Sequence, residues 1–87
     1  MAQTKLQLSN SVIVKPHVED PDLSINIGGW QGRISEINEQ DNLICINWDS
    51  ITLQQMPSAI IDRCEEEGLE WTKIYLHAEE VELTNAR

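Results

Sequence analysis

Basic residues are scarce in this 87-residue chain. Six Lys and Arg stand against 15 Asp and Glu, so the formal net charge is −9 at pH 7. A nucleic-acid partner needs a basic surface that neutralises phosphates, and anionic lipid surfaces attract basic segments for the same reason. We therefore expect no nucleic-acid and no membrane partner. The charge favours basic protein surfaces and divalent cations instead.

Long apolar runs are also missing. None approaches the roughly 20 residues that a membrane-spanning helix needs, and residues 1–5 lack the apolar segment of a signal peptide. We therefore expect a cytoplasmic protein. Its two cysteines, Cys45 and Cys64, do not form a closely spaced pair with each other or with His17 or His77. This spacing predicts reduced structural thiols and no zinc site.

Motifs of catalysis are absent from the sequence. Neither histidine lies in a nucleophile elbow, and the glycines of residues 28–32 lead into a predicted strand, whereas a phosphate-binding loop leads into a helix. The many carboxylates lie on polar segments where nothing raises a pKa. We therefore expect that the protein is not an enzyme.

The most informative pattern in the chain is a glycine-hinged β-hairpin over residues 28–49. Gly32 lies inside its first strand and indicates a bulge or a close backbone approach. Residues 38–42 (NEQDN) supply a polar turn. In the second strand, Ile44, Ile46 and Trp48 share one face.

Shorter patterns fill the rest of a chain that is long enough for one modest core. Pro57 and Ser58 open the one predicted helix, with Ser58 as its candidate cap, and Gly68 ends it. Pro16 marks an edge or the end of the first strand. The other predicted elements are a strand over 11–18, a long acidic loop over 19–27, a strand over 51–55, a segment over 69–76 that returns to the other strands, and a closing strand over 81–83.

Five short strands at this size need to hide their edges, and closure into a small barrel does so. The segments Gly29–Ile34 (GWQGRI) and Asn47–Asp49 (NWD) resemble the second and third strands of a Src-homology-3-like (SH3-like) barrel of the KOW or Tudor type. The expected fold is mainly β: a small five-stranded SH3-like barrel with one short helix inserted before the last strand. The domain is expected over residues 11–83, with an N-terminal extension (1–10) and a tail (84–87).

The resemblance implies little about activity. A groove for proline-rich ligands needs clustered tyrosines, and this chain has one Tyr and no Phe, so such ligands are not expected. The whole chain is also similar to small acidic bacterial proteins, cyanobacterial ones included, and that similarity carries no activity with it.

The acidic loop has two interpretations. Glu19, Asp20 and Asp22 space carboxylates as in the first half of a calcium loop, but Ile25 and Gln31 stand where an EF-hand needs Gly and Glu. The alternatives are a non-standard calcium site and a solvated loop whose aspartates favour a turn.

Acidic residues also gather at the end of the predicted helix, where the helix dipole disfavours them. Glu65, Glu66 and Glu67 occupy the last turn, Asp62 shares their face, and Glu70 follows. The alternatives are a patch for a basic partner and a water-exposed face that maintains solubility.

Three tryptophans complete the set of candidates. Trp48 is expected in the core. Trp30 and Trp71 lie beside the acidic segments, either as covers of the core or as contact residues, since an aromatic anchor ringed by charge is the usual anatomy of a binding hot spot.

The leading prediction is a non-enzymatic acidic protein-binding module, an adaptor or regulatory subunit, for a basic or mixed protein surface. The alternative is a calcium-binding protein, and a third hypothesis is a structural subunit that pairs through an edge near Pro16. We expect a monomer or weak homo-oligomer. The predicted partner-binding residues are Asp20, Asp22, Trp30, Glu65, Glu66, Glu70 and Trp71.

Overall fold

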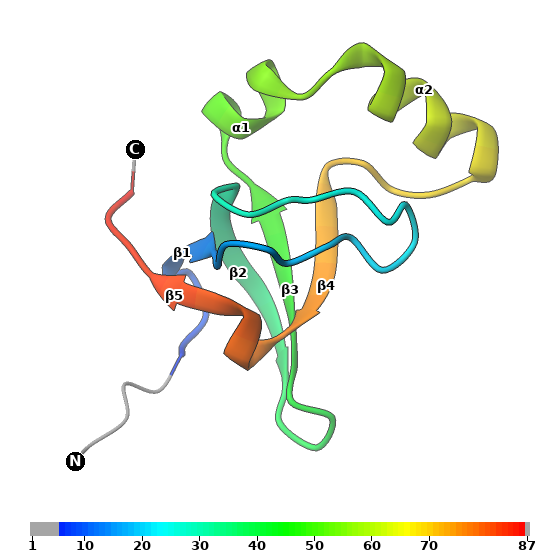
Figure 1. Ribbon diagram of the computed structural model, residues 1–87. Coiled ribbons are helices and arrows are strands. Elements are labelled where there is room, and N and C mark those ends of the chain that lie inside the picture. The colour runs from blue at the N-terminus through cyan, green and yellow to red at the C-terminus, as the bar shows by residue number, and fades with distance from the viewer. Residues whose placement is uncertain (1–5, 87) are drawn as a thin grey trace.

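A computed structural model describes residues 6–86 and shows a mainly β protein (Figure 1). The elements are β1 (Ser11–Val14), β2 (Gln31–Asn38), β3 (Leu43–Trp48), α1 (Ser50–Gln55), α2 (Ser58–Glu67), β4 (Lys73–His77), the 3-10 turn η1 (Ala78–Glu80) and β5 (Val81–Leu83). None of the helices in this described part of the chain is long and apolar enough to cross a membrane.

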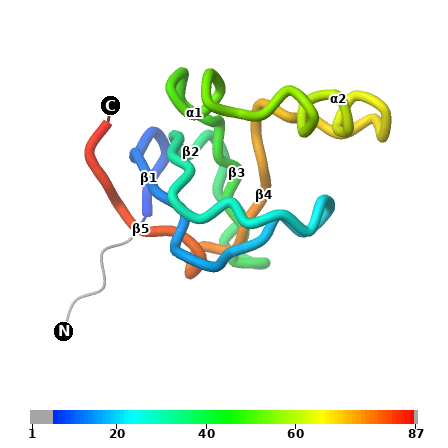
Figure 2. Tube along the Cα trace, turned by 45° about the horizontal axis from the view of Figure 1, so that its top comes forward, coloured from blue at the N-terminus to red at the C-terminus, as the bar shows by residue number. Residues whose placement is uncertain are grey.

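The strands form one five-stranded antiparallel sheet in the order β4-β3-β2-β1-β5. β1 pairs with both β2 and β5, which brings the first and last strands together. β4 and β5 are the two edges, so the sheet is open. Both helices lie at one end of the sheet and the β2–β3 turn lies at the other (Figures 1 and 2).

The predicted hairpin is confirmed as β2 and β3. Ile34 lies opposite Ile46, which lies opposite Ile74 of β4, so alternate residues of three strands meet in the core. Gly32 makes the predicted close approach, because a Cβ there would lie 2.3 Å from the carbonyl oxygen of Asn47. The register shift falls two residues later, between Ile34 and Glu36.

The buried core is almost entirely aliphatic. Trp48 belongs to it, as predicted, and Leu6 packs against it from the segment that precedes β1. That segment also contacts β2, since the Ser9 N–H donates to the Ile34 carbonyl at 2.8 Å. The buried members are Val12, Val14, Ile27, Ile34, Ile44, Ile46, Trp48, Met56, Ile74, Leu76 and Val81.

The predicted strand over residues 51–55 is wrong, because these residues form α1. The carboxylate of Asp49 accepts a hydrogen bond from the Thr52 N–H at 2.7 Å and caps the helix. Such an N-cap satisfies a backbone donor that the first helical turn leaves unpaired. The alternation of Ile51 and Leu53 spans too few residues to prevail over that local preference.

The prediction of one helix before the last strand is also wrong. Two α-helices precede β4, and only η1 stands between β4 and β5. Pro57 is the N-cap of α2 without a side-chain hydrogen bond, so Ser58 is not the cap. Gly68 ends α2 as predicted, with a left-handed φ of 72°.

Candidate functional site

The acidic loop between β1 and β2 is tightly built. The Asp20 carboxylate accepts hydrogen bonds from the N–H groups of Asp22, at 2.7 Å, and Leu23, at 3.0 Å. The Asp20 N–H also donates to the carbonyl of Ile25 at 2.8 Å. The carboxylate of Asp20 therefore shapes the turn, whereas the Asp22 side chain is exposed on its surface.

The loop is fastened to α2. Leu23 is only 5% exposed, and its carbonyl accepts a hydrogen bond from the guanidinium of Arg63 at 3.2 Å. Together with Cys64 and the segment after α2, the loop encloses a pocket of about 240 Å³ whose lining includes Asp20, Asp22 and Glu70. Lys73 also lines this pocket, so three carboxylates and one ammonium group meet where the loop approaches the segment after α2.

Glu70 is an exposed acid of this pocket. It accepts a hydrogen bond from the Thr72 hydroxyl at 2.6 Å, and this bond with a backbone bond from Thr72 lowers the pKa of Glu70. The carboxylate consequently stays ionised at neutral pH. Burial, joined by the negative charge of Asp20, raises the pKa of the Cys64 thiol, so this cysteine is a poor nucleophile. Both cysteines are buried and free of disulfides.

The aromatic side chains lie beside this acidic pocket. Trp30 stands edge-on against Trp48, with ring centroids 5.2 Å apart and an interplanar angle of 76°. Trp30 and Trp71 are half-buried and pack against the core. Both line a small hollow together with Asp20 and Glu70. Each tryptophan thus covers the core and keeps part of its ring exposed.

An uncharged groove of about 360 Å³ continues from Trp30. Its apolar walls come from Ile25 and Trp30 on the loop and from Met56, Pro57 and Ile60 at the junction of α1 and α2. We call this groove and the adjoining acidic pocket the loop–helix seam. The seam offers an apolar end and an acidic end to one extended ligand.

The structure therefore brings together five of the seven predicted partner-binding residues: Asp20, Asp22, Trp30, Glu70 and Trp71. Glu65 and Glu66 are exposed on α2 and are not among the residues that line these hollows. Arg63 forms an ion pair with Glu67 at 3.0 Å. Glu65 and Glu66 keep the last turn of α2 acidic.

The calcium hypothesis gains no supporting observation from the loop geometry. Oδ1 of Asp20 accepts both backbone N–H bonds of the turn, and Glu19 is an exposed residue whose backbone bridges to Asn26. Over residues 6–86, no group of three or more His, Cys, Asp or Glu side chains is arranged to hold a metal ion.

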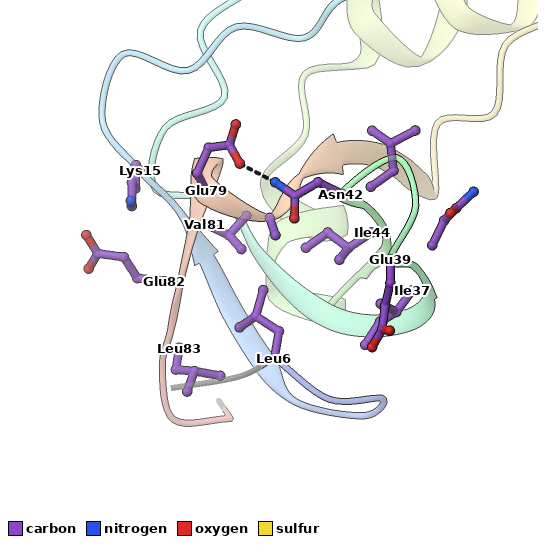
Figure 3. Close-up of a pocket in the computed structure, with 13 residues that line it drawn as sticks. Leu6, Lys15, Ile37, Glu39, Asn42, Ile44, Glu79, Val81, Glu82 and Leu83 are labelled. Atoms are coloured by element: carbon purple, nitrogen blue, oxygen red, sulfur yellow. Dashed lines mark hydrogen bonds between the residues drawn. The ribbon is translucent and has the colours of Figure 1, made fainter. Parts of the chain in front are cut away.

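A larger hollow lies at the other end of the sheet, and sequence reasoning missed it (Figure 3). This hairpin groove has a volume of about 740 Å³. The Ala78 N–H donates to the Asn42 carbonyl at 2.9 Å, and the Asn42 amide donates to the Glu79 carboxylate, so η1 is fixed to the β2–β3 turn. The groove is lined by Leu6, Lys15, Ile37, Asn38, Glu39, Asn42, Leu43, Ile44, Ala78, Glu79, Val81, Glu82 and Leu83.

One signal of this groove was present in the sequence. The alternation of Leu83 with Glu82 predicts that Leu83 faces the core. Leu83 is nevertheless 42% exposed, because Val81 is the last residue of the short strand β5 that is buried in the core. The lining residues come from four separate parts of the chain, and the sheet order assembles them: Leu6, Lys15, residues 37–44 and residues 78–83.

Comparisons of the chain with protein family models, with curated proteins and with solved structures found no match. The loop–helix seam and the hairpin groove are therefore the features that bear on function.

Proposed function

We propose that this protein is a non-enzymatic acidic protein-binding module, an adaptor or regulatory subunit, that binds a basic or mixed protein surface along the loop–helix seam. The observation that carries the proposal is the gathering of Trp30, Trp71, Asp20 and Glu70 around one hollow. Half-buried aromatic rings give a partner a rigid apolar anchor, and the surrounding charges select its sign.

The two ends of the seam define the partner segment. The uncharged groove beside Trp30 and Met56 accepts an apolar side chain. At the other end, Asp22 and Glu70 are exposed carboxylates, and together with Asp20 they outnumber the one cation there, Lys73. Their net negative charge attracts Lys or Arg. A segment with an apolar residue followed by basic residues fits both ends. The long-range attraction raises its rate of association, and salt weakens that attraction.

The framework that we propose for this surface is an SH3-like barrel. In support, β1 pairs with both β2 and β5, as the rolling of a small sheet requires. The acidic loop also approaches β4, since both line one pocket. The sheet itself is open at β4 and β5, so closure in this framework comes from packing and not from strand pairing.

The proposal is tested by affinity capture with immobilised protein from a lysate of the native host. The seam variant is Asp22→Lys/Glu70→Lys, and the matched control is Glu36→Lys/Asp41→Lys, two exposed acids that line neither the seam nor the hairpin groove. Each pair of reversals changes the net charge from −9 to −5, so a difference between the variants reports position and not total charge.

We expect the wild type and the control to retain a partner at about 50 mM salt and to lose it near 0.5 M, where exposed charges are screened. The seam variant should not retain the partner at either concentration. A partner that the seam variant holds as well as the wild type would contradict the proposal. Glu65→Lys/Glu66→Lys then shows whether the exposed acids of α2 take part.

A further inference from the structure

We propose that the hairpin groove is a second and separate docking site, which takes a short protein segment with one large apolar residue flanked on both sides by Lys or Arg. The groove shares none of its lining residues with the loop–helix seam. Its volume of about 740 Å³ lies within the range of about 300 to 1,000 Å³ that is usual for ligand sites.

The floor of the hairpin groove is apolar. Ile44 and Val81 are buried beneath it, whereas Leu6 and Ile37 are only half-buried and Leu83 is 42% exposed. Figure 3 shows the side chains of Leu6, Val81 and Ile44 in the middle of this region. Apolar side chains that remain in contact with water in a concave site gain free energy when a partner's apolar side chain covers them.

The rim of the hairpin groove is acidic on two sides. Glu79 and Glu82 stand on one side with Lys15, and Glu39 stands across the floor from them (Figure 3). Three carboxylates against one ammonium group give the rim a net negative charge. The complementary ligand therefore carries cations on either side of its apolar residue.

The groove is also pre-formed. The bonds from Ala78 to Asn42 and from Asn42 to Glu79 hold η1 against the β2–β3 turn. A site whose walls are already fixed loses little conformational entropy when the ligand binds. The apolar floor, the acidic rim and this rigidity together favour a short peptide segment as the occupant.

The test begins with a random 12-residue peptide library on phage, panned on the full chain and counter-selected on the groove variant Glu39→Lys/Glu82→Lys. Enriched sequences should place Leu, Ile, Met or Phe between basic residues. A fluorescein-labelled copy of the most enriched peptide is then titrated by fluorescence anisotropy. The groove variant should bind it at least about 10-fold more weakly, and Leu83→Ser about 5-fold more weakly.

Lys15→Glu supplies an expectation of the opposite sign. It removes the cation on the rim, so the labelled peptide should bind about 3-fold more tightly. The seam variant Asp22→Lys/Glu70→Lys should bind the peptide as the wild type does. Circular dichroism checks that each variant is folded, and chemical-shift changes at Ala78 and Leu83 in NMR spectra would place the peptide in the groove.

Three outcomes overturn the proposal: no enrichment over the groove variant, enriched peptides without basic residues, or tighter binding that fails to appear with Lys15→Glu. Peptides that the seam variant loses and the groove variant keeps would also overturn it, while they would support the proposed function of the loop–helix seam.

Discussion

Gly32→Ala is the sharpest probe of the sheet that supports both surfaces. A Cβ at position 32 would lie 2.3 Å from the carbonyl oxygen of Asn47 and 2.7 Å from Cγ2 of Ile46. A carbon and a carbonyl oxygen normally stay roughly 3.3 Å or more apart. β2 and β3 must therefore separate by about 1 Å at a point where backbone, and not a flexible side chain, obstructs the new methyl group.

Overpacking of this kind costs about 1 to 3 kcal/mol, and we expect the upper end because the obstructing atom is backbone. For a domain of this length, a loss of about 3 kcal/mol lowers the Tm by roughly 12 to 24 °C. Gly32 also lies opposite Trp48 in the register, and Trp48 supports the ring of Trp30. The tryptophan emission of the folded variant should therefore change as well.

Gly68→Ala is the matched control. It adds the same methyl group at a left-handed φ of 72°, with nothing within 4 Å of the new Cβ. Only the backbone preference opposes it, at about 1 kcal/mol, and the tryptophan emission should not change. The measurements are urea unfolding, thermal unfolding and emission spectra of both variants. The reasoning is refuted if Gly32→Ala loses no more stability than Gly68→Ala, or if its emission matches the wild type.

Three further predictions concern single hydrogen bonds. Tyr75 donates to the Glu36 carboxylate at 3.0 Å, which raises the pKa of the tyrosine; Glu36→Gln should lower that pKa, and absorbance near 295 nm reports it because the chain has one Tyr. Thr72→Val should raise the pKa of Glu70, since the bond that lowers it is lost, so Glu70 takes up its proton at a higher pH in an NMR titration. Asp49→Ala removes the cap of α1 and should cost about 0.5 to 2 kcal/mol in urea unfolding. An unchanged pKa in either titration, or unchanged stability of the Asp49 variant, would contradict the corresponding bond.

The sequence predicts best where a backbone state accepts only a few residue types. The hairpin of β2 and β3 follows from a polar turn between alternating strands, and α2 ends where Gly68 adopts a left-handed φ. The same reasoning failed at α1. Its six residues are too few for the period of a strand, 2, to be told from the period of a helix, 3.6. The signal that indicated a helix was Asp49, which caps α1 by accepting from the Thr52 N–H.

Contacts between distant segments could not be predicted in this way. The bond from Arg63 to Leu23 joins residues 40 positions apart, and it places the acidic loop against the helix-end acids. The sequence showed both acidic segments but not their proximity. The hairpin groove was missed for the same physical reason, since strand order and not local pattern brings Leu6, Ile37 and Leu83 together.

The loop–helix seam and the hairpin groove have similar chemistry but lie in different parts of the molecule. Each places exposed carboxylates beside apolar side chains that the core does not fully cover. Exposed charges further apart than the Debye length, about 8 Å at physiological salt, interact little, so occupation of one surface leaves the affinity of the other nearly unchanged. A partner with two basic segments on a linker long enough to reach both surfaces would instead gain avidity, because its second segment binds at a high effective concentration. Under these two proposals, the net charge of −9 attracts basic segments to either surface and opposes pairing between two copies of the chain.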